Sequence, residues 1–354
     1  MSSFQNNFLY LDLLADSICD TRVKKVKQVF FTQINQLIDW QQISTVIDKY
    51  YTKGTSATGK PSYDGLLLFK ICLLQTWYGL SDYEVEDRIN DSLSFSSFLE
   101  LTIDQTSPDH STISRFRTAM TGAGAYDELL KSINKQLEQH QILVKTGAIV
   151  DASIVETPLK PKGKSNYELE AQQQQEQSQE VPTKTVEKKY STSVDIEAAW
   201  IKRGKQLKYG YKKHYVTDNE GLVLGVLTTK ASVNEISNLE TVLKTADLPK
   251  DIAVKADKGY QSEKNNELLK TLGLKNNILK KATKNKALTQ AQTDYNKLIS
   301  KTRYKIERTF GSIKRWFNGG IARYRGIAKM HTQNIMEAIA YNLYRSPGIL
   351  MSKA

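Results

Sequence analysis

Apolar residues recur with helical spacing through the first 145 residues of the chain. Residues 64–78 are almost wholly apolar, which predicts a helix buried on all sides at the centre of this part. Shorter amphipathic patterns over residues 83–90, 94–101 and 126–141 predict further helices packed around it. The hydrophobic pattern therefore predicts an all-α N-terminal domain over residues 1–145.

The sequence Ser-Pro-Asp at residues 107–109 marks the start of another helix in this domain, capped by Asp109 or Ser111. Short helices interrupted in this way are typical of helix-turn-helix-like bundles, which present one helix to DNA. On that helix, the side chains expected to face DNA are Thr112, Arg115 and Arg117. The alternative is a bundle with a purely structural role, which the slightly acidic balance of this part leaves open.

At Gly147 the pattern changes from helical spacing to strands that alternate with helices. Residues 148–155 form a β-branched apolar run, typical of a strand buried on both faces. Two further strands flank an Asp-Asn-Glu-Gly turn at residues 218–221, which predicts a hairpin. The later pattern predicts helices over residues 234–245, 262–272, 288–317 and 331–344, with strands over 252–256 and 275–279. This order predicts an α/β fold, a ribonuclease-H-like mixed sheet with flanking helices.

One segment within this second part lacks the apolar content to fold. Residues 158–190 are polar and include four successive glutamines at 172–175, so we expect a flexible insertion. The predicted organisation is a DNA-binding helical domain at 1–145, a catalytic domain at 146–345 that contains the insertion, and a tail at 346–354.

The charge is distributed unevenly between the two parts. The whole chain carries a net +12, but residues 1–146 hold 14 Lys and Arg against 17 Asp and Glu, whereas residues 147–354 hold 36 against 21. Between Asp294 and Glu337 there are ten basic residues and a single acid, Glu307. A basic second half predicts a polyanionic partner such as double-stranded DNA, although a merely solvated basic face is the simpler alternative.

Composition excludes several classes of protein. No stretch approaches the ~20 apolar residues of a membrane span, and the N-terminus has no basic residues ahead of an apolar core as a secretory signal would. Two cysteines, Cys19 and Cys72, are too few for a disulfide framework or a cysteine zinc site, which fits a reducing cytoplasm. Four scattered histidines do not form a zinc motif, and His214 is predicted to be structural.

Two aspartates stand where the pattern predicts strands. Asp151 interrupts the apolar run of the first strand, and Asp257 directly follows the strand at 252–256. A carboxylate in a buried strand needs a cation or hydrogen bonds; each aspartate alone could equally be a cap or half of a salt bridge. Cleavage of a phosphodiester bond uses carboxylates to hold two Mg²⁺ ions about 4 Å apart, which stabilise the attacking and leaving oxygens.

Glu307 lies on the predicted helix over residues 288–317. On this helix Ile306, Phe310, Ile313 and Phe317 form one apolar stripe, while Arg303, Glu307 and Lys314 share a second stripe beside it. The simplest interpretation of Arg303 and Glu307 is an i, i+4 ion pair. The alternative is that Glu307 completes a metal site while Arg303 and Lys314 bind DNA phosphates.

The chain resembles the bacterial DDE transposases of insertion sequences, in the IS-five-like branch. These enzymes carry Tyr, two residues, Arg, three residues, Glu, six residues and Lys around the third carboxylate; Arg303, Glu307 and Lys314 match this spacing, and Ser300 takes the place of the Tyr. Four other stretches also resemble the family in order: residues 109–117, the Val-Asp-Ala-Ser segment around Asp151, residues 228–235, and residues 256–260.

The resemblance implies that Asp151, Asp257 and Glu307 are the catalytic, metal-binding triad, with two Mg²⁺ ions for which Mn²⁺ can substitute. It implies an enzyme of the bacterial cytoplasm, associated with the nucleoid, that binds the inverted-repeat ends of its element as a homodimer or higher oligomer. It also implies metal-dependent strand cleavage and transfer into target DNA. Two alternatives stay open: a ribonuclease-H-like nuclease without strand transfer, and a domesticated DNA-binding protein.

Overall fold

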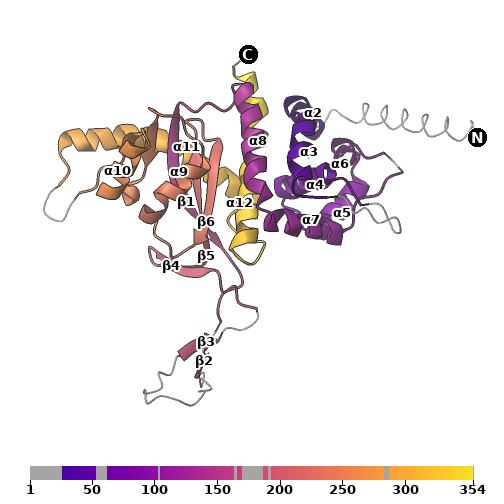
Figure 1. Ribbon diagram of the computed structural model, residues 1–354, viewed down its shortest axis with the longest axis horizontal. Coiled ribbons are helices and arrows are strands. Elements are labelled where there is room, and N and C mark those ends of the chain that lie inside the picture. The colour runs from indigo at the N-terminus through magenta and orange to yellow at the C-terminus, as the bar shows by residue number, and fades with distance from the viewer. Residues whose placement is uncertain are drawn as a thin grey trace, which may run out of the picture.

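The structure is a computed structural model that describes residues 26–52, 62–102, 104–162, 166–169, 186–189, 193–282 and 287–353. Its centre is one mixed sheet, seen edge-on among the helices in Figure 1. The strands of this sheet are β1 (Gly147–Glu156), β4 (Ala199–Arg203), β5 (Gln206–Thr217), β6 (Val223–Lys230), β7 (Ala253–Ala256) and β8 (Lys275–Ile278).

The strand order is β4-β5-β1-β7-β8, and β6 also pairs with β5. β5 runs antiparallel to β1, β4 and β6, whereas β7 runs parallel to β1 and β8 runs parallel to β7. β4 pairs with the first half of β5 and β6 with the second half, both on the side away from β1. Antiparallel strands followed by parallel strands with helical connections confirm the predicted ribonuclease-H-like mixed sheet.

The helices of the first part are α2 (Val26–Leu37), α3 (Trp40–Asp48), α4 (Gly65–Tyr78), α5 (Asp82–Asp91), α6 (Leu93–Phe98), α7 (His110–Gly122) and α8 (Ala125–Gln139). α4 is the predicted central helix: its N-cap Asp64 accepts the backbone N–H groups of Leu66 and Leu67, and Gly79 ends it in the left-handed conformation. Ten of its fourteen residues are buried, as expected for a helix that is apolar all round. Asp109, rather than Ser111, caps α7 by accepting the Thr112 N–H.

Two long helices follow the last strand in the chain, α11 (Gln290–Phe317) and α12 (Ile327–Met351). Two short helices connect strands: α9 (Leu239–Thr245) stands between β6 and β7, and α10 (Glu263–Thr271) between β7 and β8. α12 contacts β6 on one side and α8 and α4 on the other, so it lies between the sheet and the N-terminal helices (Figure 1). One hydrophobic cluster runs through both parts of the chain. The helical part and the sheet therefore share a core.

Polar side chains reinforce this contact. The Trp77 indole N–H donates to the Ala340 carbonyl at 2.9 Å, and Asn134 donates to the Val223 carbonyl at 3.0 Å. Asn342 in turn donates to Asn134 at 2.9 Å. Buried amides and indoles of this kind need partners, and here each partner belongs to the other part of the chain.

One prediction about the chain's organisation is wrong. The tail expected at residues 346–354 is instead the end of α12, because Ser346, Pro347 and Ile349 are buried against the body and hold the helix to Met351. Within the insertion expected at 158–190, the described residues include a two-stranded antiparallel ladder, β2 (Asn166–Leu169) with β3 (Val186–Lys189), and the flexibility of the insertion stays a prediction. The four glutamines at 172–175 lie outside the described residues.

Candidate active site

β1 and β7 bring Asp151 and Asp257 side by side. The two strands are parallel, and Val150 lies opposite Ala256, so the next residue on each strand is one of the two aspartates. Asp151 lies within β1, whereas Asp257 follows β7 and begins a short 3-10 turn. Both aspartates therefore stand at the strand positions that the sequence predicted, and the pairing of β1 with β7 brings them together.

Arg303 on α11 bridges the two carboxylates. One guanidinium nitrogen lies 3.0 Å from an Asp151 oxygen, and the other lies 3.4 Å from an Asp257 oxygen. The side chains of Arg303 and Asp151 are only 11% and 19% exposed, so water screens their attraction weakly. The Arg303 Nε is buried and has no hydrogen-bond acceptor among the described residues.

The apolar stripe of α11 accounts for the position of Arg303. Ile306, Phe310, Ile313 and Phe317 are buried, as predicted, and the Phe310 ring stacks on Tyr215 with 5.1 Å between centroids. Tyr215 pairs with Asp151 across β1 and β5 and therefore shares its face of the sheet. The contact between Phe310 and Tyr215 thus places Arg303, about two turns earlier on α11, over the two aspartates.

Burial and neighbouring charges act in opposite directions on Asp151. Burial raises the pKa of its carboxyl group, while the Arg303 guanidinium and the Ala152 N–H, which donates at 2.8 Å, lower it. Glu235 and Asp257 add a further increase in the pKa of Asp151, and the net shift is upward. Asp151 is a largely buried carboxylate beside two other acids. Its charged form therefore needs a nearby cation, here Arg303.

The structure does not bring Glu307 into this group. Glu307 is exposed on α11, one turn after Arg303, and the predicted alternative of an Arg303–Glu307 ion pair does not form because Arg303 binds the aspartates. No three carboxylate, histidine or cysteine side chains converge on a potential metal position within the described parts of the chain. Arg303 occupies the space between the aspartates.

The two aspartates nevertheless fit a divalent metal ion. They present hard oxygen donors from adjacent strands at the edge of a packed core, which are the ligands that Mg²⁺ prefers. Their negative charge is balanced here by a guanidinium rather than by burial in a neutral hydrogen-bond network. A metal ion bound by Asp151 and Asp257 would supply the same compensation.

A third acid near the aspartates was missed by sequence reasoning. A Cβ atom on Gly259 would lie 3.6 Å from an oxygen of Glu235 and 3.9 Å from one of Asp257, so the two carboxylates flank this glycine. The Lys212 ammonium lies 3.2 Å from the other oxygen of Glu235. The signal was present, because Glu235 ends the family-like segment 228–235, but a loop position gave no periodicity with which to orient it.

His214 lies on the other face of β5. It pairs with Ala152, whereas Tyr215 pairs with Asp151, and alternate residues of a strand face opposite sides. Its Nε2 lies 3.0 Å from the Thr229 hydroxyl, and burial lowers the pKa of the imidazole to about 3. These surroundings agree with the predicted structural role.

Lys314 lies in the last turn of α11, and its side chain is exposed. Partial desolvation lowers the pKa of its ammonium, and the neighbouring cations Lys213, Lys208 and Arg203 lower it further. Glu156, at the end of β1, is the acid that opposes this effect. Lys314 therefore belongs to a basic region at the opposite end of β1 from its start at Gly147.

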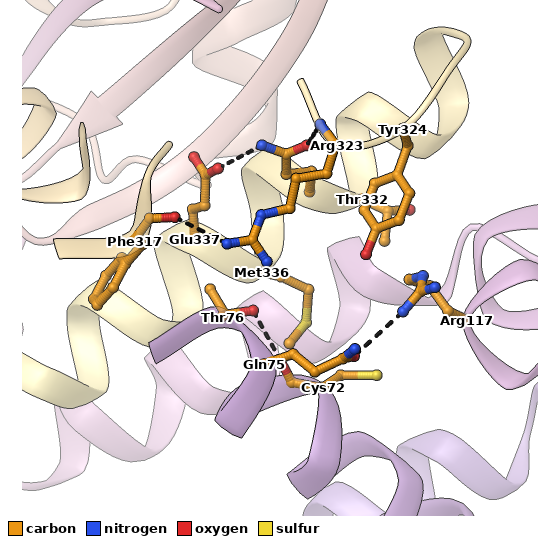
Figure 2. Close-up of a pocket in the computed structure, with 11 residues that line it drawn as sticks. Cys72, Gln75, Thr76, Arg117, Phe317, Arg323, Tyr324, Thr332, Met336 and Glu337 are labelled. Carbon is orange, nitrogen blue, oxygen red and sulfur yellow. Dashed lines mark hydrogen bonds between the residues drawn. The ribbon is translucent and has the colours of Figure 1, made fainter. Parts of the chain in front are cut away.

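The prediction that Arg117 faces DNA is wrong. Arg117 is 9% exposed and binds Asp82 through two hydrogen bonds of 2.6 and 2.9 Å, and its guanidinium lies over the Tyr324 ring at 4.7 Å. In Figure 2 Arg117 lines a small pocket together with Tyr324, and its guanidinium donates a hydrogen bond to the Gln75 side chain. The helical spacing of α7 turns Arg117 toward the core, two positions away from Arg115.

Arg115 is exposed, and its guanidinium donates to the Ser111 hydroxyl at 2.9 Å. The Thr112 hydroxyl donates to Asp109, so it reinforces the cap of α7. Arg115 lines an open depression between α5 and α7, together with Tyr83 and His110, whose rings stack at 3.9 Å. Of the three residues predicted to face DNA, Arg115 is the one whose positively charged side chain is exposed.

In the described part of the chain, no helix is both long and apolar enough to cross a membrane. The long helix α12 is largely buried by protein on several sides rather than uniformly apolar.

Two family models match parts of this chain. Residues 143–343 match the family model described as "Transposase DDE domain", and residues 19–119 match one described as "Transposase domain". The chain is 35% identical over 243 residues to the transposase for insertion sequence element IS1106 of Neisseria meningitidis serogroup B, covering 68% of this chain and 79% of that protein.

Solved structures that resemble the chain share little of its sequence. One is the piggyBac transposase synaptic complex with hairpin DNA, with 11% identity and a TM-score of 0.40 over 92% of this chain and 75% of that one. Another is the Mos1 strand transfer complex, with 11% identity and a TM-score of 0.20 over 84% and 81%. The family model spans more than half of the chain and the Neisseria relative is similar over two thirds of it, so the chain belongs to the bacterial insertion-sequence DDE transposases, enzymes that cut and rejoin nucleic acid.

Proposed function

We propose that this transposase binds the inverted-repeat ends of its insertion sequence and catalyses metal-dependent strand cleavage and strand transfer into target DNA. The observation that carries the proposal is the in-register pair of Asp151 and Asp257 on β1 and β7, with α11 docked over it. This arrangement supplies a compact acidic centre beside a basic helix. The enzyme would act at the nucleoid, in the bacterial cytoplasm, where its DNA substrate lies.

Asp151, Asp257 and Glu307 would hold two Mg²⁺ ions, with Mn²⁺ able to substitute. When bound, these ions activate an oxygen nucleophile and stabilise the charge on the leaving oxygen. Glu307 lies one turn after Arg303 on the same side of α11, about 6 Å along the helix at 1.5 Å per residue. A glutamate side chain can span much of that distance once Arg303 releases the aspartates.

The chain's own cations would bind the DNA backbone. Arg303 would exchange its two aspartates for a DNA phosphate when the site is filled, because a guanidinium binds both groups through paired hydrogen bonds. Lys314 would bind a second phosphate from the last turn of the same helix. Both contacts would add affinity without sequence preference.

Sequence recognition would come from the N-terminal helices, through Arg115 and Thr112 on α7. Arg115 is exposed beside an open depression, so a base edge or a phosphate can approach it. Two ends of the element must be brought together for transfer, so we propose that the active complex is a homodimer or a higher oligomer on DNA.

The triad is tested by the variants Asp151→Asn, Asp257→Asn and Glu307→Gln. Each should lower cleavage of an end duplex in Mg²⁺ by at least about 100-fold, because a clamp with one ligand removed no longer stabilises the transition-state charge. Binding to the same duplex should be unchanged. Gel assays of cleavage and strand transfer, alongside binding titrations, measure the two quantities separately.

The exposed acid Glu267 on α10 provides a matched control, since Glu267→Gln removes the same charge at the far edge of the sheet. Full cleavage by Glu307→Gln would show that Glu307 is not part of the site, and Glu235 would then be the candidate for the third carboxylate. Cleavage without strand transfer by the unaltered enzyme would identify a nuclease instead.

A further inference from the structure

The turn between β4 and β5 concentrates positive charge. Arg203 pairs with Gln206, so only Gly204 and Lys205 connect the two strands. Gly204 has φ +61, the left-handed conformation that such a tight turn requires and that glycine adopts without strain. The turn holds Lys202, Arg203 and Lys205 within four positions, all three exposed.

These cations have no acidic partner among the described residues. Lys202, Arg203 and Lys205 form no ion pair there, whereas Lys208 pairs with Glu156. Lys314 joins the group from α11, close enough that Lys208 and Arg203 both repel its charge. We call Lys202, Arg203, Lys205, Lys208 and Lys314 the hairpin patch. A concentration of like charge of this kind attracts a polyanion.

The patch is held rigidly. β4 and β5 pair along five positions, and the exposed Trp200 of β4 packs on Tyr209 of β5 with 5.0 Å between ring centroids. Lys213, three residues beyond the last β4–β5 pair at Gly210, is fully buried and binds Glu337 of α12 at 2.7 Å. The hairpin therefore extends from a firmly anchored strand, so its cations form a preorganised surface rather than a mobile tail.

The patch stands at a defined distance from the acidic pair. Lys202 and Arg203 pair with Leu207 and Gln206 of β5, which lie eight and nine residues before Tyr215, the partner of Asp151. At about 3.4 Å per residue this separation is roughly 30 Å. Phosphates of one DNA strand follow one another at about 3.4 Å along the helix axis. The same separation corresponds to about nine base pairs of duplex.

We propose that the hairpin patch binds backbone phosphates of duplex DNA about nine base pairs from the bond that reacts at Asp151 and Asp257. This proposal rests on the proposed function, since it assumes that the reacting phosphate lies at the two aspartates. It adds a second, sequence-independent anchor on the edge of the sheet opposite β8. Trp200 offers an apolar surface beside the cations against which a deoxyribose can pack.

The test is the triple variant Lys202→Ala, Arg203→Ala and Lys205→Ala. Its control is Lys250→Ala, Lys264→Ala and Lys270→Ala, which removes three exposed cations near β8 at the opposite edge of the sheet. Binding is titrated without added divalent metal, so that no cleavage occurs, on end duplexes shortened stepwise from each side of the cut. Each phosphate contact contributes about −0.9 to the slope of log affinity against log salt.

On long duplexes, the triple variant should flatten that slope by about 2 to 3 units relative to the control. In one of the two shortened series, the difference from the unaltered enzyme should vanish once fewer than about nine base pairs remain beyond the cut. An unchanged slope, or an equal loss on long and short duplexes, would overturn the proposal. Thermal melts verify that both variants fold.

Failure of the proposed function would look different. If Asp151→Asn still cleaves, the acidic centre is misassigned, yet the salt slope of the triple variant still reports whether the patch binds DNA. If Asp151→Asn is inactive and the triple variant shows no length dependence, the centre stands and the patch is not a DNA contact at this position.

Discussion

Arg115 and Arg117 lie two positions apart on α7 and have opposite surroundings. One guanidinium is exposed at the rim of a depression, while the other is buried in an ion pair with Asp82. Two positions correspond to about 200° around a helix, so neighbouring basic residues of this spacing face opposite sides. A basic residue on a predicted recognition helix therefore supports DNA contact only when its face is known.

Arg117→Ala should destabilise the protein by roughly 3 kcal/mol, because it leaves Asp82 partly buried without its cation. Urea unfolding at neutral pH measures the loss. Arg115→Ala should leave stability within about 0.5 kcal/mol of the unaltered protein and reduce discrimination between end and scrambled duplexes by roughly 1–3 kcal/mol if it contacts a base. The opposite pairing of outcomes, a stable Arg117→Ala that no longer discriminates, would show that Arg117 contacts DNA after all.

β5 shows how one strand supports two environments. Its alternate residues Lys213 and Tyr215 face α11 and α12 and position the acidic centre, whereas Lys212 and His214 face the other side. Lys212 nevertheless reaches Glu235, which approaches Asp257 around Gly259. Residues on both faces of β5 therefore contact the groups that surround the two aspartates.

Burial of His214 predicts a pH dependence of stability. Its pKa is lowered to about 3 by burial, so the folded protein keeps the imidazole neutral while the unfolded chain takes up a proton below about pH 6.5. Stability is therefore fully present above pH 6.5 and falls by about 1.4 kcal/mol per pH unit below it. The loss continues as the pH approaches 3.

His214→Gln can keep a hydrogen bond to Thr229 but cannot be protonated. Between pH 7 and pH 4, the stability of the unaltered protein should fall by roughly 3 kcal/mol relative to this variant. Chemical denaturation at a series of pH values measures the difference. Parallel pH profiles for the two proteins would mean that His214 remains accessible to protons in the folded state.

At the scale of the whole molecule, the helical part and the catalytic part are not independent. α12 is covered by β6 on one side and by α4 and α8 on the other, and the small pocket of Figure 2 joins residues from both parts, among them Gln75, Arg117, Arg323 and Glu337. The N-terminal helices are therefore held in a fixed position relative to the acidic centre. Recognition of a DNA end can position the reacting bond through this shared core.

A fragment of residues 143–354 should not fold by itself. Removing α2 to α8 would expose the buried apolar residues of α12 and remove the hydrogen bonds that Trp77 and Asn134 make with it. Calorimetry and circular dichroism should show no cooperative unfolding transition for the fragment, with the full chain as control. A sharp transition for the isolated fragment would establish two separable domains.

Local patterns predicted much of this fold. The β-branched run at 148–155, the hairpin turn at 218–221 and the apolar stripe of Ile306, Phe310, Ile313 and Phe317 each correspond to an observed element, because strand alternation, turn chemistry and helical periodicity act between near neighbours. The same holds for Asp109 as a cap. Asp151 was predicted within a strand and Asp257 directly after one, and each lies there.

Contacts between residues far apart in the chain were decided only by the tertiary structure. The pairing of Arg117 with Asp82, the bridge from Arg303 to both aspartates and the approach of Glu235 to Asp257 each join side chains from separate elements. The extension of α12 to Met351 depends likewise on burial against distant residues. The sequence by itself determined which residues are acidic, basic or apolar and in what local conformation. Which cation neutralises which acid depends on how the elements pack, since Coulomb attraction and burial act through space rather than along the chain.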